Sequence, residues 1–260
     1  MKKLTSIIEG VIAIVALIAI WQIASTTGMF GRVSVRASQL LLPAPIKVFK
    51  SIYEMVISGY LLSNLLVSII RVLKGFALAV IIGIPVGILM GTNKHFYNFI
   101  NPIFRLIAPI PGVAWVPLAI LWFGLGDSAA VFIITMGSLS PIITNTLQGV
   151  KSVDPILIQA LDTMSATRLQ KVTKCIIPSI IPHIVSGFQL GFGFAWRVVI
   201  AAELVGVPNG LGYVLNTGRS TGQTDITIVT ILCLGFIMFF TDQFLFRSIS
   251  NLTRNWQSYT

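Results

Sequence analysis

Gln159-Ala160-Leu161-Asp162-Thr163-Met164-Ser165-Ala166, followed twelve residues later by Pro178, is the stretch that decides how this chain is organised. It belongs to a polar, basic segment that separates two long apolar stretches. Charged side chains are costly inside hydrocarbon, so a polar connector between two apolar stretches lies outside the bilayer. A solvated connector is the ordinary alternative to a functional role for such a loop.

Local capping signals divide this segment into two short helices. Asp154 stands before Pro155, the pattern of an N-cap followed by proline in the first helical position. Thr167 with Gln170 three residues later predicts a capping box that opens a second helix. This helix has a basic stripe of Arg168, Lys171 and Lys174 and an apolar stripe of Leu169, Val172 and Ile176. An amphipathic helix outside the bilayer needs a protein partner for its apolar stripe, so the segment predicts a docking surface.

At these residues the chain resembles the permease subunits of binding-protein-dependent ATP-binding-cassette importers. Their signature loop reads Glu-Ala-Ala, three residues, Gly, nine residues, Ile, one residue, Leu-Pro. Here the corresponding residues are Gln159-Ala160-Leu161, Ser165, Cys175 and Ile177-Pro178, of which Ala160 and Pro178 are identical. Serine adopts the left-handed backbone of such a bend less readily than glycine does. We therefore expect the bend either on Ser165, under slight strain, or shifted to Ala166-Thr167.

Flanking segments extend the resemblance to residues 40–250. Residues 108–118, Ala-Pro-Ile-Pro-Gly-Val-Ala-Trp-Val-Pro-Leu, with Trp-Phe-Gly at 122–124, are similar to the nitrate, sulfonate, taurine and bicarbonate branch. Residues 194–204, Phe-Ala-Trp-Arg-Val-Val-Ile-Ala-Ala-Glu-Leu, and Gly-Leu-Gly-Tyr at 210–213 are similar to it as well.

The resemblance implies the type I importer permease fold, all-α and membrane-integral, with about six transmembrane helices and a cytoplasmic coupling helix. It implies a homodimer in a bacterial cytoplasmic (inner) membrane, two ATPase subunits that bind ATP and Mg²⁺, and an extracytoplasmic solute-binding protein. The transported solute would be small and anionic, such as a sulfonate, taurine or nitrate, with a pyrimidine-type vitamin precursor as the alternative. The residues that would couple to the ATPase are Gln159, Ala160, Asp162, Ser165, Ala166, Thr167, Arg168, Lys171 and Pro178.

Composition leads independently to a membrane protein. Hydrophobic residues make up 55% of the 260 residues and charged residues 10%, against about a quarter charged in a soluble domain. Cys175 and Cys233 lie in different environments, so neither a disulfide nor a metal site is expected. No phosphate-binding glycine loop or catalytic motif occurs in the sequence, so we expect a transporter subunit that is no enzyme and holds no cofactor.

Apolar stretches of about 20 residues predict six spans in one transmembrane domain, residues 1–260. They cover residues 62–90, 102–123, 128–150, 179–205 and 226–246, which form a core at 62–247, preceded by an additional span at 7–25. Lys2-Lys3 before that first span also fits a signal peptide, but no clear cleavage site follows. Residues 26–60 form the extracytoplasmic segment, and residues 46–57 have the spacing of a helix on the membrane surface.

The distribution of cations places both termini in the cytoplasm. In this orientation the inner segments hold Lys2, Lys3, Lys94, Arg105, Lys151, Arg168, Lys171, Lys174, Arg247 and Arg254, and the outer segments hold Arg32, Arg36, Lys47, Lys50 and Arg219. Arg71 and Lys74, near the outer start of the second span, count weakly against it. The docking segment then lies inside the cell, where an ATPase could reach it.

Four residues are candidates for the translocation pathway: Trp115, Trp196, Arg197 and Glu203. A charge near the bilayer centre costs about 2.5–3.5 kcal/mol on insertion scales and must face water or protein. Arg197 could meet a sulfonate or carboxylate, or each charge could satisfy a neighbouring helix. An ion-driven secondary transporter is the main rival, and it requires acidic relay residues, for which Glu203 is the candidate. An intramembrane enzyme lacks catalytic groups.

Glycine stripes predict close helix contacts in two spans. Gly83, Gly87 and Gly91 share one face of the second span, and Gly187, Gly191 and Ala195 share one face of the fifth. Packing within the subunit and contact with a moving neighbour are both open. Four prolines predict bends or breaks in their helices: Pro85, Pro109, Pro111 and Pro117.

The orientation predicts which engineered cysteines an impermeant thiol reagent reaches in intact cells. Cysteine at position 38 should be labelled and cysteine at position 258 should not, because the membrane shields the cytoplasmic side. Labelling at 258 but not at 38 would show the opposite orientation. Amino-terminal sequencing that starts near Gly28 would instead show a cleaved signal.

Overall fold

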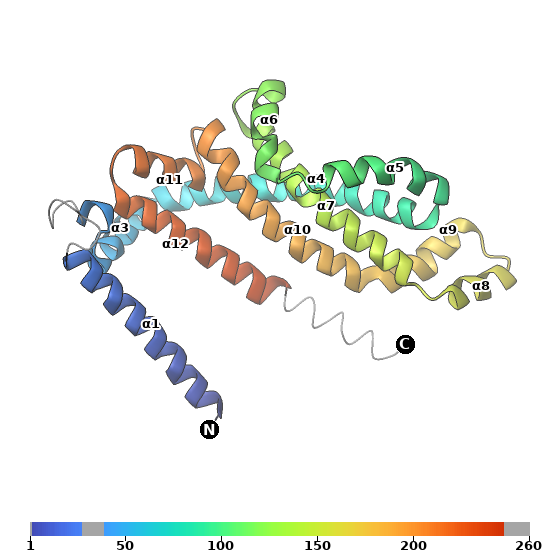
Figure 1. Cartoon of the computed structure of the whole chain (residues 1–260), viewed down its shortest axis with the longest axis horizontal. Coiled ribbons are helices and arrows are strands. Elements are labelled where there is room, and N and C mark those ends of the chain that lie inside the picture. The colour runs from blue at the N-terminus through green and yellow to red at the C-terminus, as the bar shows by residue number, and fades with distance from the viewer. Residues whose placement is uncertain (1, 28–38, 247–260) are drawn as a thin grey trace. The chain divides into compact units, whose positions relative to one another are not determined.

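Helices account for all the regular structure that the computed structural model shows in the residues it describes, 2–27 and 39–246 (Figure 1). Five helical segments of this part are long and apolar enough to cross a membrane, and a sixth span results if one bent helix pair is counted. The all-α membrane fold predicted from the sequence is thereby confirmed. Ser38, Ser258, Arg32, Arg36, Arg247 and Arg254 lie outside the described residues.

The chain divides into two compact units, the first of residues 1–66 and 209–235 and the second of residues 67–208 and 236–260. The first unit contains α1 (Lys2–Thr26), α3 (Pro45–Ile57), the start of α4 (Tyr60–Thr92), α11 (Leu211–Ser220) and most of α12 (Thr224–Phe240). The second unit holds the rest of α4 and the remaining elements.

Polar contacts to the backbone and between helices hold the first unit together. Ser25 Oγ donates to the carbonyl oxygen of Leu42 at 2.8 Å, which ties the end of α1 to the chain before α3. Ser51 Oγ donates to Asp225 at 2.6 Å and connects α3 to α12. The helix predicted at residues 46–57 is therefore present as α3, while α11 was not predicted.

In the second unit, α7 (Asp127–Ser152) packs between α4 and α10 (Ile177–Gly206) through the glycine stripes. A Cβ atom on Gly83 would lie 2.8 Å from Ile142 Cγ2, and one on Gly91 would lie 2.4 Å from Val150 Cγ1. On the α10 side, a Cβ on Gly191 would lie 3.1 Å from Ile142 Cγ1. Both stripes thus pack within the chain, as small residues do where helix backbones approach closely.

The span predicted at residues 102–123 is present as a bent pair of helices, which confirms the break predicted at Pro109 and Pro111. The chain forms α5 (Lys94–Ile107), a 3-10 turn η1 (Gly112–Trp115) and α6 (Val116–Phe123), and the two halves are bent by 90°. Pro109 and Pro111 stand in the break, where they lack the N–H that a continuing helix needs. Of the bends or breaks predicted at the other two prolines, no break occurs at Pro85, since α4 continues through it, and Pro117 lies in the first turn of α6, where proline is tolerated.

The helix α4 is longer than the hydrocarbon layer is thick. The 33 residues of α4 extend about 50 Å at 1.5 Å per residue, compared with about 30 Å of hydrocarbon. The last predicted span is α12 followed by a π-helix, η3 (Thr241–Phe246). A π-helix has a wider turn and is frequent at functional sites.

Gly75 on α4 provides a test of the close packing against α7. A Cβ there would lie 2.7 Å from Ile134 Cβ and 2.9 Å from the carbonyl oxygen of Val131, which cannot move without shifting α7. Gly75→Ala should lower the stability of the chain by about 1–3 kcal/mol, measured by thermal unfolding in detergent. Gly235→Ala is the matched control, because no atom lies within 4 Å of a Cβ there. Equal midpoints for the two variants would contradict the packing.

Candidate functional site

We call residues 154–178 the docking segment. Its two short helices begin where the sequence indicated. The Asp154 side chain accepts a hydrogen bond from the N–H of Ile156 at 2.8 Å and caps α8 (Pro155–Thr163). Thr167 and Gln170 form the capping box that opens α9 (Arg168–Lys171), with the Gln170 side chain accepting from the N–H of Thr167 at 2.8 Å. Both capping predictions are confirmed.

The bend between α8 and α9 lies on Ser165, which has a left-handed φ of 57°. Its N–H donates to Asp162 O at 3.0 Å, and the N–H of Ala166 donates to Leu161 O at 3.0 Å. These two bonds are the pair that ends a helix in a Schellman motif, in which glycine usually takes the left-handed position. The bend has therefore not shifted to Ala166-Thr167, and serine occupies the strained position.

The second short helix is not separate from the fifth span, contrary to the sequence prediction. From α9 the chain continues through a π-helix, η2 (Val172–Ile176), directly into α10, so that Arg168–Gly206 is one helical stretch of 39 residues. Ile176 is buried in a cluster with Val150, Val153 and Ile180, against which Val172 also packs. The chain itself therefore covers two of the three positions of the predicted apolar stripe.

Lys171 also departs from the predicted basic stripe. Its Nζ forms an ion pair with Asp162 and fastens α9 to α8. Gln159 and Ala160 are exposed on α8, and Pro178 is exposed in the first turn of α10. Figure 1 shows α8 and α9 joined by a short loop beyond the end of α7.

Several large apolar side chains of the segment remain exposed: Ile156 (67%), Leu157 (48%), Met164 (77%) and Leu169 (72%). The side chains of Arg168 and Lys174 are exposed as well. We call these six residues the docking face. The Schellman bend at Ser165 and the Lys171–Asp162 pair connect the two short helices, and the docking face lies on both of them and on η2.

A buried group of charges connects three helices of the second unit. Arg71 on α4 donates from Nη1 to Glu203 Oε1 on α10 at 2.8 Å, and from Nε and Nη2 to Asp127 Oδ1 at 2.8 and 2.7 Å. Ser68 Oγ donates to both carboxylate oxygens of Glu203. The side chains of Arg71 and Glu203 are 2% and 0% exposed, while that of Asp127 is 65% exposed. We call these four residues the Arg71 cluster.

Sequence reasoning missed this cluster because it treated Arg71 as a charge at the start of a span. Arg71 lies well inside α4, which begins at Tyr60, so it is not a loop charge and does not bear on the orientation in the membrane. The signal was Glu203, a carboxylate in an apolar helix that needs a buried cation. Of the two alternatives for Glu203, satisfaction by a neighbouring helix is the one observed; its role in a pathway stays a prediction.

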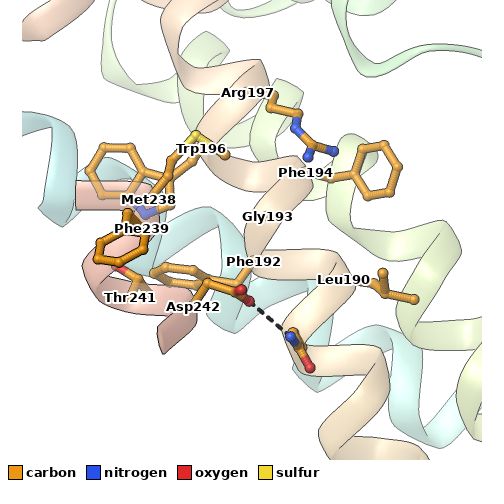
Figure 2. Close-up of a pocket in the computed structure, with 11 residues that line it drawn as sticks. Leu190, Phe192, Gly193, Phe194, Trp196, Arg197, Met238, Phe239, Thr241 and Asp242 are labelled. Carbon is orange, nitrogen blue, oxygen red and sulfur yellow. Dashed lines mark hydrogen bonds between the residues drawn. The ribbon is translucent and has the colours of Figure 1, made fainter. Parts of the chain in front are cut away.

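Arg197 and Trp196 line a pocket of about 350 Å³ on α10, closed by Met238 and Phe239 of α12 and by Thr241 and Asp242 of η3 (Figure 2). The Arg197 guanidinium lies 5.5 Å from the centre of the Phe194 ring. Trp115 is not among the lining residues; it packs edge-on against Phe132. The structure thus brings together two of the four pathway candidates.

The Arg71 cluster predicts a large loss of stability when only one charge is removed. Arg71→Met leaves the Glu203 carboxylate buried without its cation, which should cost about 3–5 kcal/mol in the free energy of unfolding. Lys74→Met, an exposed change on the same helix, is the control. The double variant Arg71→Met, Glu203→Leu should recover part of the loss because no charge remains to be desolvated. Thermal unfolding that ranks Arg71→Met with Lys74→Met would refute the pairing.

The sequence is similar to those of known membrane transport proteins. Residues 83–251 match the family described as binding-protein-dependent transport system inner membrane component. A putative ABC transporter permease protein of Methanocaldococcus jannaschii is 40% identical over 181 residues, covering 69% of this chain and 68% of its relative. A putative aliphatic sulfonates transport permease protein of Bacillus subtilis is 30% identical over 250 residues, covering 96% and 88%.

The fold comparison agrees with the sequence comparison. A structure described as an inward-facing conformation of the MetNI methionine ABC transporter superposes with a TM-score of 0.66 at 21% identity, covering 74% of this chain and 96% of the other. The resemblance first noted in the loop around Ser165 is confirmed. The chain belongs to the family of inner membrane components of binding-protein-dependent transport systems, which are the permease subunits of ABC importers.

Proposed function

We propose that this chain imports a small anionic solute of the sulfonate type, which a solute-binding protein delivers and which two ATPase subunits drive across the membrane. Two copies of the chain enclose the pathway. The observation that carries the proposal is the docking face, whose four apolar side chains are 48–77% exposed although the segment is capped and internally braced. A braced segment with an unused apolar surface is suited to a groove on a partner protein.

The continuous helix from α9 to α10 supplies the mechanical link. Movement of α8 by a partner reaches α9 through the Lys171–Asp162 pair, and α9 continues without interruption through η2 into α10. Arg197 and Glu203 lie on α10, so a shift of the docking segment is carried to the residues in the membrane. In this scheme the docking face lies in the cytoplasm of a bacterium, with both termini on the same side.

ATP and Mg²⁺ belong to the partner in this proposal. The sequence has no glycine-rich loop with lysine and serine or threonine that would cradle phosphates. The chain's own contribution is to bind the ATPase and to guide the solute, and it needs no cofactor for either role.

The choice of an anionic solute rests on Arg197 and on the Bacillus subtilis relative named for aliphatic sulfonates. No carboxylate among the described residues lies within ion-pair distance of Arg197, and its guanidinium can offer two parallel donors to a sulfonate. The alternative of a pyrimidine-type vitamin precursor gives this charge no partner. An ion-driven secondary transporter would need an acidic residue that relays the ion. The candidate, Glu203, is paired with Arg71, which disfavours this alternative.

The docking face should be required for assembly with the ATPase. Leu169→Asp combined with Arg168→Glu places negative charge on an apolar, basic surface, and should reduce the ATPase that co-purifies with the chain at least tenfold. Both side chains are exposed, so the fold of the permease is preserved.

Ile46→Asp, the same apolar-to-acidic change as Leu169→Asp at a 76% exposed position on α3, is the control and should leave co-purification unchanged. The docking proposal is wrong if the double variant co-purifies with as much ATPase as the unchanged chain and supports normal ATP-dependent uptake.

A further inference from the structure

A cavity of about 510 Å³ lies beside the break between α5 and α6, within the second unit. The irregular backbone of residues 108–112 forms one wall, and Leu190 and Phe194 of α10 form another. The third wall is a single stripe of α7, made up of Gly137, Ser140, Pro141, Thr144 and Asn145. We call this space the break cavity. None of its lining residues, which all belong to the described part of the chain, is an Asp, Glu, Lys or Arg.

The break cavity lies near the centre of the bilayer. Ser140 and Pro141 stand midway along α7, a helix of 26 residues that begins at Asp127 and has Lys151 in its last turn. At 1.5 Å per residue α7 extends about 39 Å, and the charged residues at its two ends belong outside a hydrocarbon layer about 30 Å thick. Its middle therefore crosses the apolar centre, where unpaired polar groups are most costly.

Two hydroxyl groups in the α7 wall lack the partners that a comparable hydroxyl of the same helix has. The Thr135 hydroxyl lies 2.8 and 3.1 Å from two backbone carbonyl oxygens. Within the described residues, the hydroxyls of Ser140 and Thr144 form no hydrogen bond. The Asn145 amide nitrogen donates to the carbonyl oxygen of Pro141 at 2.8 Å, which leaves its own Oδ1 as an acceptor. Because unpaired hydroxyls are unfavourable in hydrocarbon, these groups indicate water or a polar solute in the cavity.

Prolines deprive backbone carbonyl groups of their helical donors in the same region. Pro141 lies inside α7 and has no N–H for the carbonyl oxygen of Gly137, one turn earlier. Pro109, in the break, has none for the carbonyl oxygen of Arg105. Irregular backbone at membrane depth is tolerated only where protein covers it or where it lines a water-filled cavity. Since Ile110 remains 41% exposed, the described part of the chain does not cover the break.

Arg197 stands at the border of the break cavity. Figure 2 shows it on the same side of α10 as Leu190 and Phe194, opposite Met238 and Asp242. Its guanidinium lies 5.5 Å from the centre of the Phe194 ring, and Phe194 lines the break cavity whereas Arg197 does not. The cavity thus has a fixed positive charge beside it and neutral groups inside.

We propose that the break cavity holds water and is the middle of the passage through which the solute crosses the membrane, with Ser140, Thr144 and Asn145 as its hydrogen-bonding wall. The inference rests on the proposed function and adds the place where the solute passes. The ligand is a small polar solute that exchanges hydrogen bonds with water for hydrogen bonds with hydroxyl and amide groups. Neutral groups suit a passage, because a solute that is held too tightly does not leave.

Thiol labelling distinguishes a water-filled cavity from one that lipid or a second copy of the chain fills. Ser140→Cys and Thr144→Cys are made separately in a chain without its own thiols, which carries Cys175→Ser and Cys233→Ala. Ile81→Cys in the same chain is the control, because it places a thiol at the same depth outside the cavity.

The depth of Ile81 follows from the packing of α4 against α7. The two helices run side by side in the same direction, and a Cβ on Gly83 would lie 2.8 Å from Ile142 Cγ2. The residues two positions earlier, Ile81 and Ser140, are therefore level with each other. Ile81 is 66% exposed and is not among the residues that line the break cavity.

The measurement is the rate at which a charged, water-soluble methanethiosulfonate modifies the full chain in lipid nanodiscs, without the ATPase. The Ser140→Cys and Thr144→Cys chains should react at least about tenfold faster than the Ile81→Cys chain, because the thiolate is the reacting form and apolar surroundings suppress its formation. Rates are normalised to those of the same chains unfolded in SDS. Rates for the first two chains that do not exceed that of the Ile81→Cys chain would overturn the proposal.

The role as a passage is tested in the complex with the ATPase. A passage opens and closes as the solute crosses, so the rate for Thr144→Cys should differ between the nucleotide-free complex and the complex trapped with ATP and vanadate. We expect a difference of at least about fivefold, the low end of common coupling between two sites. The rate for Ile81→Cys should be the same in both states. Equal rates for Thr144→Cys would show a cavity that takes no part in transport, which contradicts the proposal.

Failure of this inference is distinguishable from failure of the proposed function. Labelling of the chain alone tests the cavity, and co-purification of the ATPase tests the docking face. Fast labelling of the Ser140→Cys and Thr144→Cys chains without ATPase binding would support the water-filled cavity and contradict the importer scheme. ATPase binding with slow labelling would do the reverse.

Discussion

The ion pair between Arg71 and Glu203 is the interaction on which the membrane-embedded part of the second unit depends. It joins α4 to α10, and the second carboxylate, Asp127, adds the first turn of α7 to the same arginine. Removing two charges from water is expensive, and their attraction compensates only when the hydrogen bonds are nearly complete. The Ser68 hydroxyl, 2.8 and 2.9 Å from the two oxygens of Glu203, shares its one proton between them and adds to the hydrogen bonding of this carboxylate.

Close backbone contact extends the arrangement along the helices. Every glycine of the α4 stripe faces a side chain of α7, and α10 approaches α7 from another side through Gly187 and Gly191. In lipid there is little hydrophobic driving force between helices, so van der Waals contact at short range stabilises their association. The Arg71 cluster fixes how far the helices are shifted along one another. The close contacts at the glycines keep them from sliding.

Irregular backbone interrupts the helices of the second unit at several places. The 90° break between α5 and α6 contains Pro109 and Pro111, the π-helix η2 lies between the docking segment and α10, and the π-helix η3 carries Asp242. The π-helix η2 adjoins the docking face, at which a partner is proposed to bind. By contrast, α4 continues through Pro85 without a break.

Some features were accessible from local sequence because their causes are local. The caps at Asp154 and Thr167 depend on side chains reaching backbone within three residues, and the apolar spans depend only on length and composition. The left-handed backbone at Ser165 was accessible too, although only through the glycine that the resembling family places there. These features indicated the family without any knowledge of tertiary contacts.

Other features depend on residues distant in sequence and could be settled only by the fold. The sequence around Arg71 does not indicate that Glu203, 132 positions away, is its partner. Likewise, the sequence around Val172 does not indicate that Val150 and Ile180 pack near it. The apolar and basic stripes of residues 168–176 looked unpartnered because a helical pattern shows which side chains share a face, but not what packs against that face. Local chemistry by itself determined the caps, the spans and the family; tertiary packing decided which charges are buried together and which apolar side chains remain free.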